Sequence, residues 1–334
     1  MILVTGGTGL VGSHLLYHLL LKNDSVKAIH QNTSDLLVVK KVFSYFTSDV
    51  DTLYDKIVWF EADLNDVPEL EIAFKDITHV YHCAAFISFD PKDYKKMRKI
   101  NIDGTTNIVN QCILNSISKL CFVSSVATLE KDIKKDVIDE SENWENTKDK
   151  SGYAITKYGA EKEVWRASQE NVDIVIVNPG VILGSGFWNK GSSSLFLKVK
   201  NGFPFYTEGI AGFVDVIDVV QIMQKLMLSE VKNERFVLVS ENITFKDLFF
   251  QIADALKVKR PVLRVSKTWS EIIWRFEKVK STIFRSSPVI TKYSSRSSQS
   301  KKIYSSIKIK SVLNVTFIKI TKTIQRVSKD LISK

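Results

Sequence analysis

The sequence predicts an α/β fold, in which a doubly wound parallel sheet is covered by helices on both faces and followed by a smaller C-terminal lobe. Short apolar runs alternate with longer helical patterns through the first half of the chain. A glycine cluster at residues 5–12 lies directly between the first apolar run and the first helical pattern. The 334 residues suffice for a large α/β core and a smaller second unit. Strict alternation of strand and helix favours right-handed crossovers and parallel strands.

Each expected element follows from a local pattern. Runs of apolar and β-branched residues predict strands, and apolar residues three and four positions apart predict helices. The expected strands are Ile2–Thr5, Val26–His30, Ile57–Ala62, Thr78–Cys83, Leu120–Val123 and Asp173–Asn178. The expected helices are Leu10–Lys22, Asp35–Phe46, Tyr94–Asn115 and Gly152–Ser168. The polar stretch Glu130–Lys150 has no sustained period, so we expect it to be an excursion after the fifth strand.

The second half of the chain alternates less regularly. We expect a loop at Gly184–Ser194, strands at Phe213–Val216 and Arg235–Val239, and a helix at Thr244–Leu256. We assign residues 1–183 to the sheet domain and residues 184–334 mainly to a substrate-binding lobe, with elements at about 213–240 returning to the sheet. Apolar residues resume after the serine- and lysine-rich stretch 285–306, so we expect a packed C-terminal end.

Charge is distributed unevenly along the chain. Of the net charge of +10, residues 257–334 contribute +17, from 20 lysines and arginines against three acidic residues, and residues 1–256 contribute −7. A basic segment attracts anionic lipid or nucleic acid. No zinc-finger, helix-turn-helix or RNA-recognition signature accompanies it, so we expect no nucleic-acid partner. A solvated basic surface on the C-terminal lobe is the expectation.

Cysteine usage and hydropathy point to a reduced compartment. The three cysteines, Cys83, Cys112 and Cys121, form no C-x-x-C pair, so we expect neither a disulfide framework nor a metal site. The first residues contain no basic leader before an apolar run, and no stretch of about 18 apolar residues occurs. We therefore expect a cytoplasmic protein without a transmembrane segment.

The strongest local motif is T-G-G-T-G-L-V-G at residues 5–12. Gly6 permits a tight turn, Gly9 lets the backbone approach a pyrophosphate, and Gly12 allows a helix to pack closely on the sheet. The helix that starts at Leu10 then offers free N–H groups and a partial positive charge to phosphates. A strand, this turn and a helix in succession predict a Rossmann domain that binds a dinucleotide.

Further motifs occur at strand ends and in helices. They are Asp63-Leu64, His82-Cys83-Ala84-Ala85, Asn101-Ile102-Asp103-Gly104-Thr105, Ser124-Ser125 and Tyr153-Ala154-Ile155-Thr156-Lys157. With the glycine turn, this set resembles the extended short-chain dehydrogenase/reductase family, within the NAD-dependent epimerase/dehydratase superfamily, over at least residues 1–220. The resemblance implies an NAD(P)-dependent enzyme, with Asp63 near the adenine ring and residues 82–85 along the cofactor.

The resemblance also implies catalytic roles for Ser125, Tyr153, Lys157 and Asn101. Tyr153 and Lys157 share one helix face because they are four residues apart. A free phenol has a pKa of about 10, and we expect the Lys157 ammonium to lower the Tyr153 pKa so that the phenol exchanges a proton near neutral pH. Ser125 would hydrogen-bond the substrate oxygen. Asn101 is implied to help position a water that connects to Lys157.

The residues expected to bind the cofactor lie in the glycine turn, at strand ends and on the tyrosine helix. They are Gly6, Thr8, Gly9, Leu10, Val11, Gly12, His30, Asp63, Leu64, Cys83, Ala84, Ala85, Tyr153, Lys157, Pro179, Gly180 and Val181. The second strand ends in His30-Gln31-Asn32-Thr33, without the carboxylate that binds a ribose 2′-hydroxyl in NAD-preferring sites. The cofactor is NADP or NAD, and this missing carboxylate favours NADP.

Two later motifs bear on the substrate. Asn178–Gly186 and Gly212–Val216 look like the dihydroflavonol-reductase and 3β-hydroxysteroid-dehydrogenase branch, which acts on alcohols and ketones of fairly apolar molecules. Residues 179–234 contain no arginine for the diphosphate of a nucleotide-sugar. We predict a carbonyl reductase or alcohol dehydrogenase for a small, fairly apolar substrate. A nucleotide-sugar epimerase or dehydratase is the alternative, and Tyr153 and Lys157 argue against a dinucleotide-binding sensor without catalysis.

Three further expectations concern surfaces and caps. The amphipathic pattern at Trp269–Val279 is expected to pack against the substrate cleft or the sheet edge, and contact with a membrane surface is the alternative. Asp215 and Asp218 are expected to orient backbone or to cap the following helix rather than to touch substrate. The resemblance implies a homodimer, formed by two long helices of each protomer.

Overall fold

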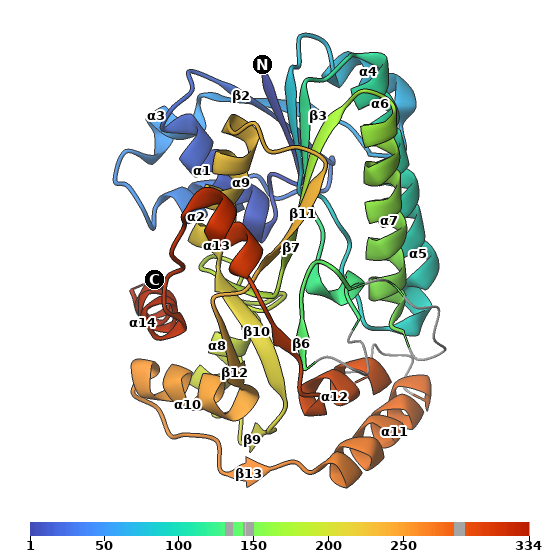
Figure 1. Ribbon diagram of the computed structural model, residues 1–334. Coiled ribbons are helices and arrows are strands. Elements are labelled where there is room, and N and C mark those ends of the chain that lie inside the picture. Colours follow the sequence, from blue (N-terminus) through green and yellow to red (C-terminus); the bar gives the residue numbers. More distant parts are fainter. Residues whose placement is uncertain (131–135, 143, 145–149, 284–290, 334) are drawn as a thin grey trace.

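A computed structural model describes residues 1–130, 136–142, 144, 150–283 and 291–333 (Figure 1). Its centre is a seven-stranded sheet in which all paired strands are parallel. The strand order is β11 (Glu234–Leu238), β7 (Asp173–Pro179), β5 (Lys119–Val123), β4 (His79–His82), β1 (Ile2–Thr5), β2 (Val26–His30) and β3 (Ile57–Glu61). The strand order reverses between β1 and β4, which is where open α/β sheets bind nucleotides. The predicted Rossmann fold is confirmed.

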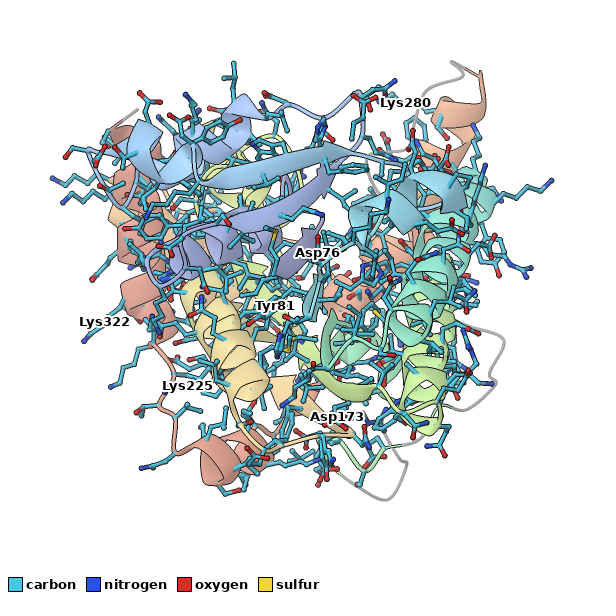
Figure 2. The ribbon with its side chains drawn as sticks, turned by 90° about the horizontal axis from the view of Figure 1, so that it is seen from above. Asp76, Tyr81, Asp173, Lys225, Lys280 and Lys322 are labelled. Carbon is cyan, nitrogen blue, oxygen red and sulfur yellow. The ribbon has the colours of Figure 1, made fainter. Side chains whose placement is uncertain are left out.

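Helices cover both faces of this sheet, as the view from above shows (Figure 2). Successive strand residues point into two cores, because side chains alternate along a strand. Leu3 and Leu120 belong to one core, and their neighbours Val4 and Cys121 belong to the other. The first core is covered by α4 (Val67–Ala73), α6 (Gly104–Leu114) and α7 (Gly152–Gln169). The second is covered by α1 (Leu10–Leu20), α2 (Leu37–Phe43), α9 (Val216–Leu228) and α13 (Ile307–Leu313).

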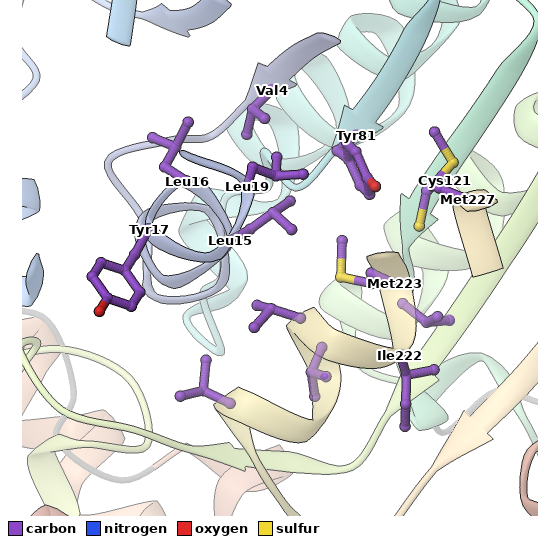
Figure 3. Close-up of a cluster of buried hydrophobic side chains, with 14 of the residues drawn as sticks. Val4, Leu15, Leu16, Tyr17, Leu19, Tyr81, Cys121, Ile222, Met223 and Met227 are labelled. Carbon is purple, nitrogen blue, oxygen red and sulfur yellow. The ribbon is translucent and has the colours of Figure 1, made fainter. Parts of the chain in front are cut away.

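The helix α9 comes late in the chain but packs on the sheet domain. Leu15 and Leu19 of α1 lie near Met223 of α9, with Tyr81 of β4 next to them, and Ile222 belongs to the same buried core (Figure 3). All five side chains are at most 4% exposed. Of the segment 213–240, therefore, α9 and β11 lie with the large sheet, whereas its first strand belongs to a smaller sheet.

The smaller lobe has its own core. Its three-stranded sheet has the order β12 (Glu241–Thr244), β10 (Ile210–Asp215) and β8 (Val181–Leu183). Phe196, Phe213 and Ile324 are buried between this sheet and its helices, which are α8 (Ser194–Lys200), α10 (Phe245–Leu256) and α14 (Ile320–Ile332). There are also two short strand pairs. In one, β13 (Leu263–Arg264) pairs with β9 (Phe205–Tyr206), and in the other β14 (Ile303–Tyr304) pairs with β6 (Val137–Ile138). The remaining helices of the lobe are α11 (Lys267–Ile283) and α12 (Lys292–Gln299).

Several helices differ from the expected ones. The helix expected at Tyr94–Asn115 consists of α5 (Tyr94–Arg98), a π-helical turn η2 (Lys99–Asp103) and α6, after a short 3-10 turn η1 (Pro91–Asp93). The helix expected at Asp35–Phe46 is only the seven-residue α2, and α3 (Val50–Tyr54) follows it. We did not predict α3 or α4, which are too short to show a sustained helical period. The cap of α4 was visible in the sequence, since Asp66 accepts a hydrogen bond from the Glu69 N–H.

The C-terminal region packs in part as expected. Ile309 of α13 is fully buried against the large sheet, whereas Ile307 is 74% exposed. The expectation that the stripe on α11 packs inward is wrong for Trp269 and Phe276, which are 61% and 71% exposed. Parts of two expected segments, at 131–135, 143 and 145–149 and at 285–290, lie outside the described residues. In the described part of the chain, no helix is long and apolar enough to cross a membrane.

Replacing Ile309 by Ala tests whether α13 is an integral part of the large core. The change should lower the free energy of unfolding by about 3 kcal/mol, because it removes buried methyl groups and leaves a cavity. The matched variant Ile307→Ala changes an exposed residue two positions earlier on the same helix. Its free energy of unfolding should stay within about 0.5 kcal/mol of the parent. Urea unfolding followed by circular dichroism measures both, and equal stability of the two variants would contradict this packing.

Candidate active site

The glycine turn is shaped by two close contacts. Gly6 has a φ of 69°, and a Cβ there would lie 2.6 Å from the Ala84 nitrogen. A Cβ on Gly12 would lie 2.1 Å from the Gly6 carbonyl oxygen. The turn is therefore pressed between the end of β4 and the start of α1, and side chains at Gly6 and Gly12 are sterically excluded.

The N-terminus of α1 is suited to an anion. Its N-cap, Gly9, provides no side-chain hydrogen bond, and the first turn contains no acidic residue. The leading N–H groups of the helix, at Leu10, Val11 and Gly12, therefore have no cap from a side chain. A Cβ on Gly9 would meet only the Gly6 carbonyl oxygen, at 3.3 Å. A pyrophosphate fits this end of the helix by charge and by the space above Gly9.

A buried chain of hydrogen bonds connects the glycine turn to the π-helical turn η2. Thr5 Oγ1 lies 2.6 Å from His82 Nδ1, and His82 Nε2 lies 2.9 Å from Thr105 Oγ1. The Thr105 hydroxyl donates to the Asn101 carbonyl oxygen at 2.6 Å. Burial, together with the Lys157 charge, lowers the pKa of His82 to about 3, so this imidazole is neutral at pH 7. The chain fixes the ends of β1 and β4 against the helix that follows.

The Asn101 side chain joins a loop to α7. Its Nδ2 donates to the Phe86 carbonyl oxygen at 3.0 Å and to Thr156 Oγ1 at 3.1 Å, and its Oδ1 accepts from the Phe86 N–H at 2.7 Å. Asn101 thus lies beside Thr156, the neighbour of Lys157 in sequence. The Asn101 amide is thus bonded to protein partners. The implied water between Asn101 and Lys157 stays a prediction.

Ser125 lies at the end of β5, near enough to Tyr153 for its side chain to affect the pKa of that phenol. Ser125 is the N-cap of the 3-10 turn η3 (Val126–Thr128), where its Oγ accepts from the Ala127 N–H at 3.1 Å. Burial raises the pKa of the Tyr153 phenol, and a hydrogen bond with the Ser125 side chain lowers it. The net shift of the Tyr153 pKa is upward and not downward as expected, because burial outweighs the contact with Ser125. The phenol is therefore protonated at neutral pH. The effect of the Lys157 ammonium on this phenol stays a prediction.

Lys157 is one of the largest fully buried side chains. Its Nζ donates to the Val123 carbonyl oxygen at 2.7 Å and lies 4.2 Å from the centroid of the Phe122 ring. Burial lowers the pKa of Lys157 to about 8, and the negative charge of Glu161 opposes this shift. Because that pKa still exceeds 7, the ammonium form predominates at neutral pH. Lys157 thus places a positive charge at the carboxyl end of β5.

Glu161 is a site residue that the sequence analysis missed. It follows Lys157 by four residues on α7 and is 1% exposed. Its Oε2 accepts hydrogen bonds from three side chains, Ser124 at 2.5 Å, Thr128 at 3.0 Å and Asn178 at 3.0 Å. Its Oε1 accepts from Arg235 Nη1 at 3.1 Å. The signal was the spacing, since an acid four residues after Lys157 lies on the buried face of the helix.

Arg235 extends this contact to the segment after β5. Its Nε and Nη2 donate to the Glu140 carbonyl oxygen, and Nη2 also donates to the Glu142 carbonyl oxygen. The Glu140 carboxylate accepts from the Val237 N–H at 2.6 Å. The described part of the polar excursion is therefore held against β11 by an arginine whose charge Glu161 balances.

The other predicted cofactor residues lie at the carboxyl ends of neighbouring strands. Gln31 Nε2 donates to Asp63 Oδ2 at 2.8 Å, which joins the ends of β2 and β3. Burial raises the Asp63 pKa, but hydrogen bonds from Asn65 and Gln31 lower it by more than burial raises it. The net result is a pKa below the usual range of an aspartate. Leu64 accepts a hydrogen bond from Asn107 through its carbonyl oxygen, and His30 contacts the Trp59 ring edge-on.

Two more predicted segments flank this edge. Cys83 follows β4 directly, and burial raises the pKa of its thiol to about 12, so it is not a thiolate. Pro179, Gly180 and Val181 carry the chain from the large sheet into the small one, since β7 ends at Pro179 and β8 begins at Val181. Thr8 lies in the glycine turn, and Ala85 lies in the loop after β4.

The two aspartates of α9 have structural roles, as predicted. Asp215 is the N-cap of α9, accepting from the Ile217 N–H at 2.8 Å, and it also pairs with Arg326 at 2.7 Å. Asp218 accepts from the Ile318 N–H at 2.8 Å. Both carboxylates therefore hold backbone and the C-terminal helix α14 in place.

Comparisons with known proteins agree with this arrangement. The NAD dependent epimerase/dehydratase family matches residues 2–238. Anthocyanidin reductase of Arabidopsis thaliana is 27% identical over 291 residues, covering 80% of this chain and 83% of that protein. UDP-glucose 4-epimerase of Vibrio cholerae is 28% identical over 208 residues, covering 61% of this chain and 58% of that protein. The crystal structure of gox2253, 24% identical, has a TM-score of 0.82 over 100% of this chain and 98% of that chain, which shows the same fold.

Replacing Glu161 by Gln tests the buried ion pair. The change keeps the shape of the side chain but leaves the Arg235 charge without its counter-charge, so it should lower the free energy of unfolding by about 3 kcal/mol. Glu163→Gln, on the same helix but 29% exposed, breaks only a surface pair with Arg166 and should cost less than about 1 kcal/mol. Chemical denaturation of both variants measures the difference, and equal costs would rule out a special role for Glu161.

Proposed function

Because the chain belongs to the NAD dependent epimerase/dehydratase family, we propose that it is an NAD(P)-dependent oxidoreductase that interconverts a carbonyl group and an alcohol. The observation that carries this proposal is the placement of Tyr153 one helical turn before Lys157, whose side chain is buried at the carboxyl end of β5, where Ser125 also lies. Residues 1–183 would bind the cofactor, and residues 184–334 would mainly bind the substrate.

The protein's own groups suit a reduction at neutral pH. When bound, the nicotinamide dinucleotide supplies the hydride. Tyr153 would donate its phenolic proton to the substrate oxygen, and Ser125 would donate a hydrogen bond to the same oxygen as its negative charge develops. The Lys157 ammonium would stabilise the resulting phenolate and hold the ribose hydroxyls. The N–H groups at the start of α1 would bind the pyrophosphate.

Three arginines that follow residues 179–234 support a small, fairly apolar substrate rather than a nucleotide-sugar. Arg235 is 3.1 Å from Glu161, Arg260 is 2.7 Å from Asp254, and Arg264 is 2.6 Å from Glu208. Each of these arginines is thus already paired with a carboxylate. Residues 179–234 supply no other arginine for a diphosphate. These pairings favour a carbonyl reductase or alcohol dehydrogenase.

A nucleotide-sugar epimerase is the second candidate. The similarity to UDP-glucose 4-epimerase of Vibrio cholerae supports it. An epimerase returns the hydride to its product, so the cofactor shows no net change. Net oxidation of NADPH by an added ketone or aldehyde therefore supports the reductase, and interconversion of UDP-sugars without net oxidation supports the epimerase.

Tyr153→Phe is the test of the proposed chemistry. Loss of the phenolic proton should lower kcat about 10²- to 10⁴-fold, while NADPH fluorescence titration should show unchanged cofactor binding. Tyr158→Phe, on the same helix, should keep full turnover, because Tyr158 stacks on Trp144 away from Ser125. Full activity of the Tyr153→Phe variant would contradict the proposal.

The second test concerns the cofactor. We propose NADP as the preferred one, because the loop after β2 offers an amide and not a carboxylate at residues 31 and 32. Asn32→Asp should lower the ratio of kcat/KM for NADPH to that for NADH at least about tenfold, since a carboxylate repels a 2′-phosphate and accepts a ribose 2′-hydroxyl. The control Gln169→Glu adds the same charge at the exposed end of α7 and should leave the ratio unchanged. An unchanged ratio in Asn32→Asp would remove the basis for this preference.

A further inference from the structure

The helix α11 exposes a stripe of large apolar side chains on its outer surface. Trp269, Ile272 and Phe276 are 61%, 51% and 71% exposed. Their spacing of three and four residues places them in one stripe along the helix. Three large apolar side chains in one exposed stripe differ from isolated exposed apolar residues, which are ordinary on a protein surface.

The two most buried described side chains of α11 are both serines. Ser270 and Ser281 are 6% and 5% exposed. Ser270 Oγ lies 2.5 Å from Ser295 Oγ of α12, and Ser295 Oγ also donates to the Ser270 carbonyl oxygen at 3.0 Å. Hydrogen bonds between serines therefore attach α11 to α12, and its largest apolar residues are left for another partner. Trp274, whose Nε1 donates to Glu271, is only partly buried.

Further exposed apolar residues occur at the strand pair that precedes α11 in the chain. Val262 and Leu263 are 76% and 50% exposed, and Phe205 of β9 is 40% exposed. The pair β9–β13 and the helix α11 lie at the same end of the molecule, at the bottom of Figure 1. We call Phe205, Val262, Leu263, Trp269, Ile272 and Phe276 the basal surface.

Basic residues are frequent in the segment that carries most of the basal surface. Residues 257–280 hold eight lysines and arginines and two glutamates, and all eight basic side chains are exposed. Lys280 lies at the periphery of the molecule when it is seen from above (Figure 2). Four of the cations pair with Asp254, Glu208, Glu271 and Glu277. The eight cations still outnumber these four carboxylates, so the segment 257–280 carries excess positive charge.

We propose that the basal surface docks on the anionic surface of a lipid bilayer. Exposed apolar side chains including a tryptophan, in a segment rich in exposed lysines and arginines, match the boundary between acyl chains and negatively charged headgroups. A second copy fits less well, because an interface between two identical patches would bring like charges together. The proposal stands independently of the proposed reaction, since none of these residues belongs to the candidate active site.

The test is co-sedimentation of the full chain with vesicles of phosphatidylcholine containing phosphatidylglycerol. The parent should bind at low salt, bind pure phosphatidylcholine vesicles weakly, and dissociate as salt screens the charges. The triple variant W269S/I272S/F276S should partition at least about tenfold less, because its apolar insertion is lost. The matched triple variant L37S/L114S/L228S replaces side chains that are 70%, 71% and 82% exposed elsewhere and should bind as the parent does.

A second readout reports on Trp269 itself. Vesicles with brominated acyl chains should quench its fluorescence on binding, and the variant Trp269→Phe should lose that part of the quenching. The absence of binding to anionic vesicles at low salt would overturn the proposal, as would equal binding of the two triple variants. A dimer in sedimentation velocity that only W269S/I272S/F276S disrupts, without vesicle binding by the parent, would assign the surface to a second copy instead. Circular dichroism checks that all variants fold.

Discussion

The buried carboxylate of Glu161 is the interaction on which the candidate active site depends. It receives hydrogen bonds from Ser124 after β5 and an ion pair from Arg235 in β11, so it joins α7 to two strands. A carboxylate buried without partners costs several kcal/mol, so the helix can dock only where these donors meet it. The same helix carries Lys157 one turn earlier and Tyr153 two turns earlier. One contact therefore seats the helix and sets both reactive side chains against the end of β5.

The sequence sufficed for the parts of the fold that depend on local patterns. Strands of the large sheet carry short apolar runs, and several motifs of the candidate site, such as residues 82–85 and Ser124-Ser125, lie at or just after the ends of these strands. Glu161 escaped notice because an acid in a helix is ordinarily solvated, and its burial is decided by Arg235, 74 residues later. The direction of the Tyr153 pKa shift escaped for the same reason, since burial is a property of the assembled fold and not of the spacing to Lys157.

The second half shows the limit of periodicity more clearly. A helical period in α11 indicates that an apolar side exists, but not whether that side faces the protein. The orientation is set by Ser270 and Ser295, whose mutual hydrogen bonds make the polar side the inner one. In α13 the same kind of pattern points inward, and Ile309 is buried in the core of the large sheet. Two helices with apolar residues at helical spacing thus turn their apolar sides in opposite directions, because the neighbouring element decides which face is covered.

The protonation states of the two reactive side chains favour one direction of the proposed reaction. Burial keeps the Tyr153 phenol protonated at neutral pH, while Lys157, with a pKa of about 8, remains largely charged. A protonated phenol can donate to the oxygen of a carbonyl substrate but cannot accept a proton from an alcohol. Reduction therefore begins from the states already present at pH 7, whereas oxidation first requires the phenol to lose its proton. Glu161 contributes to this readiness, because its negative charge opposes the loss of the Lys157 proton.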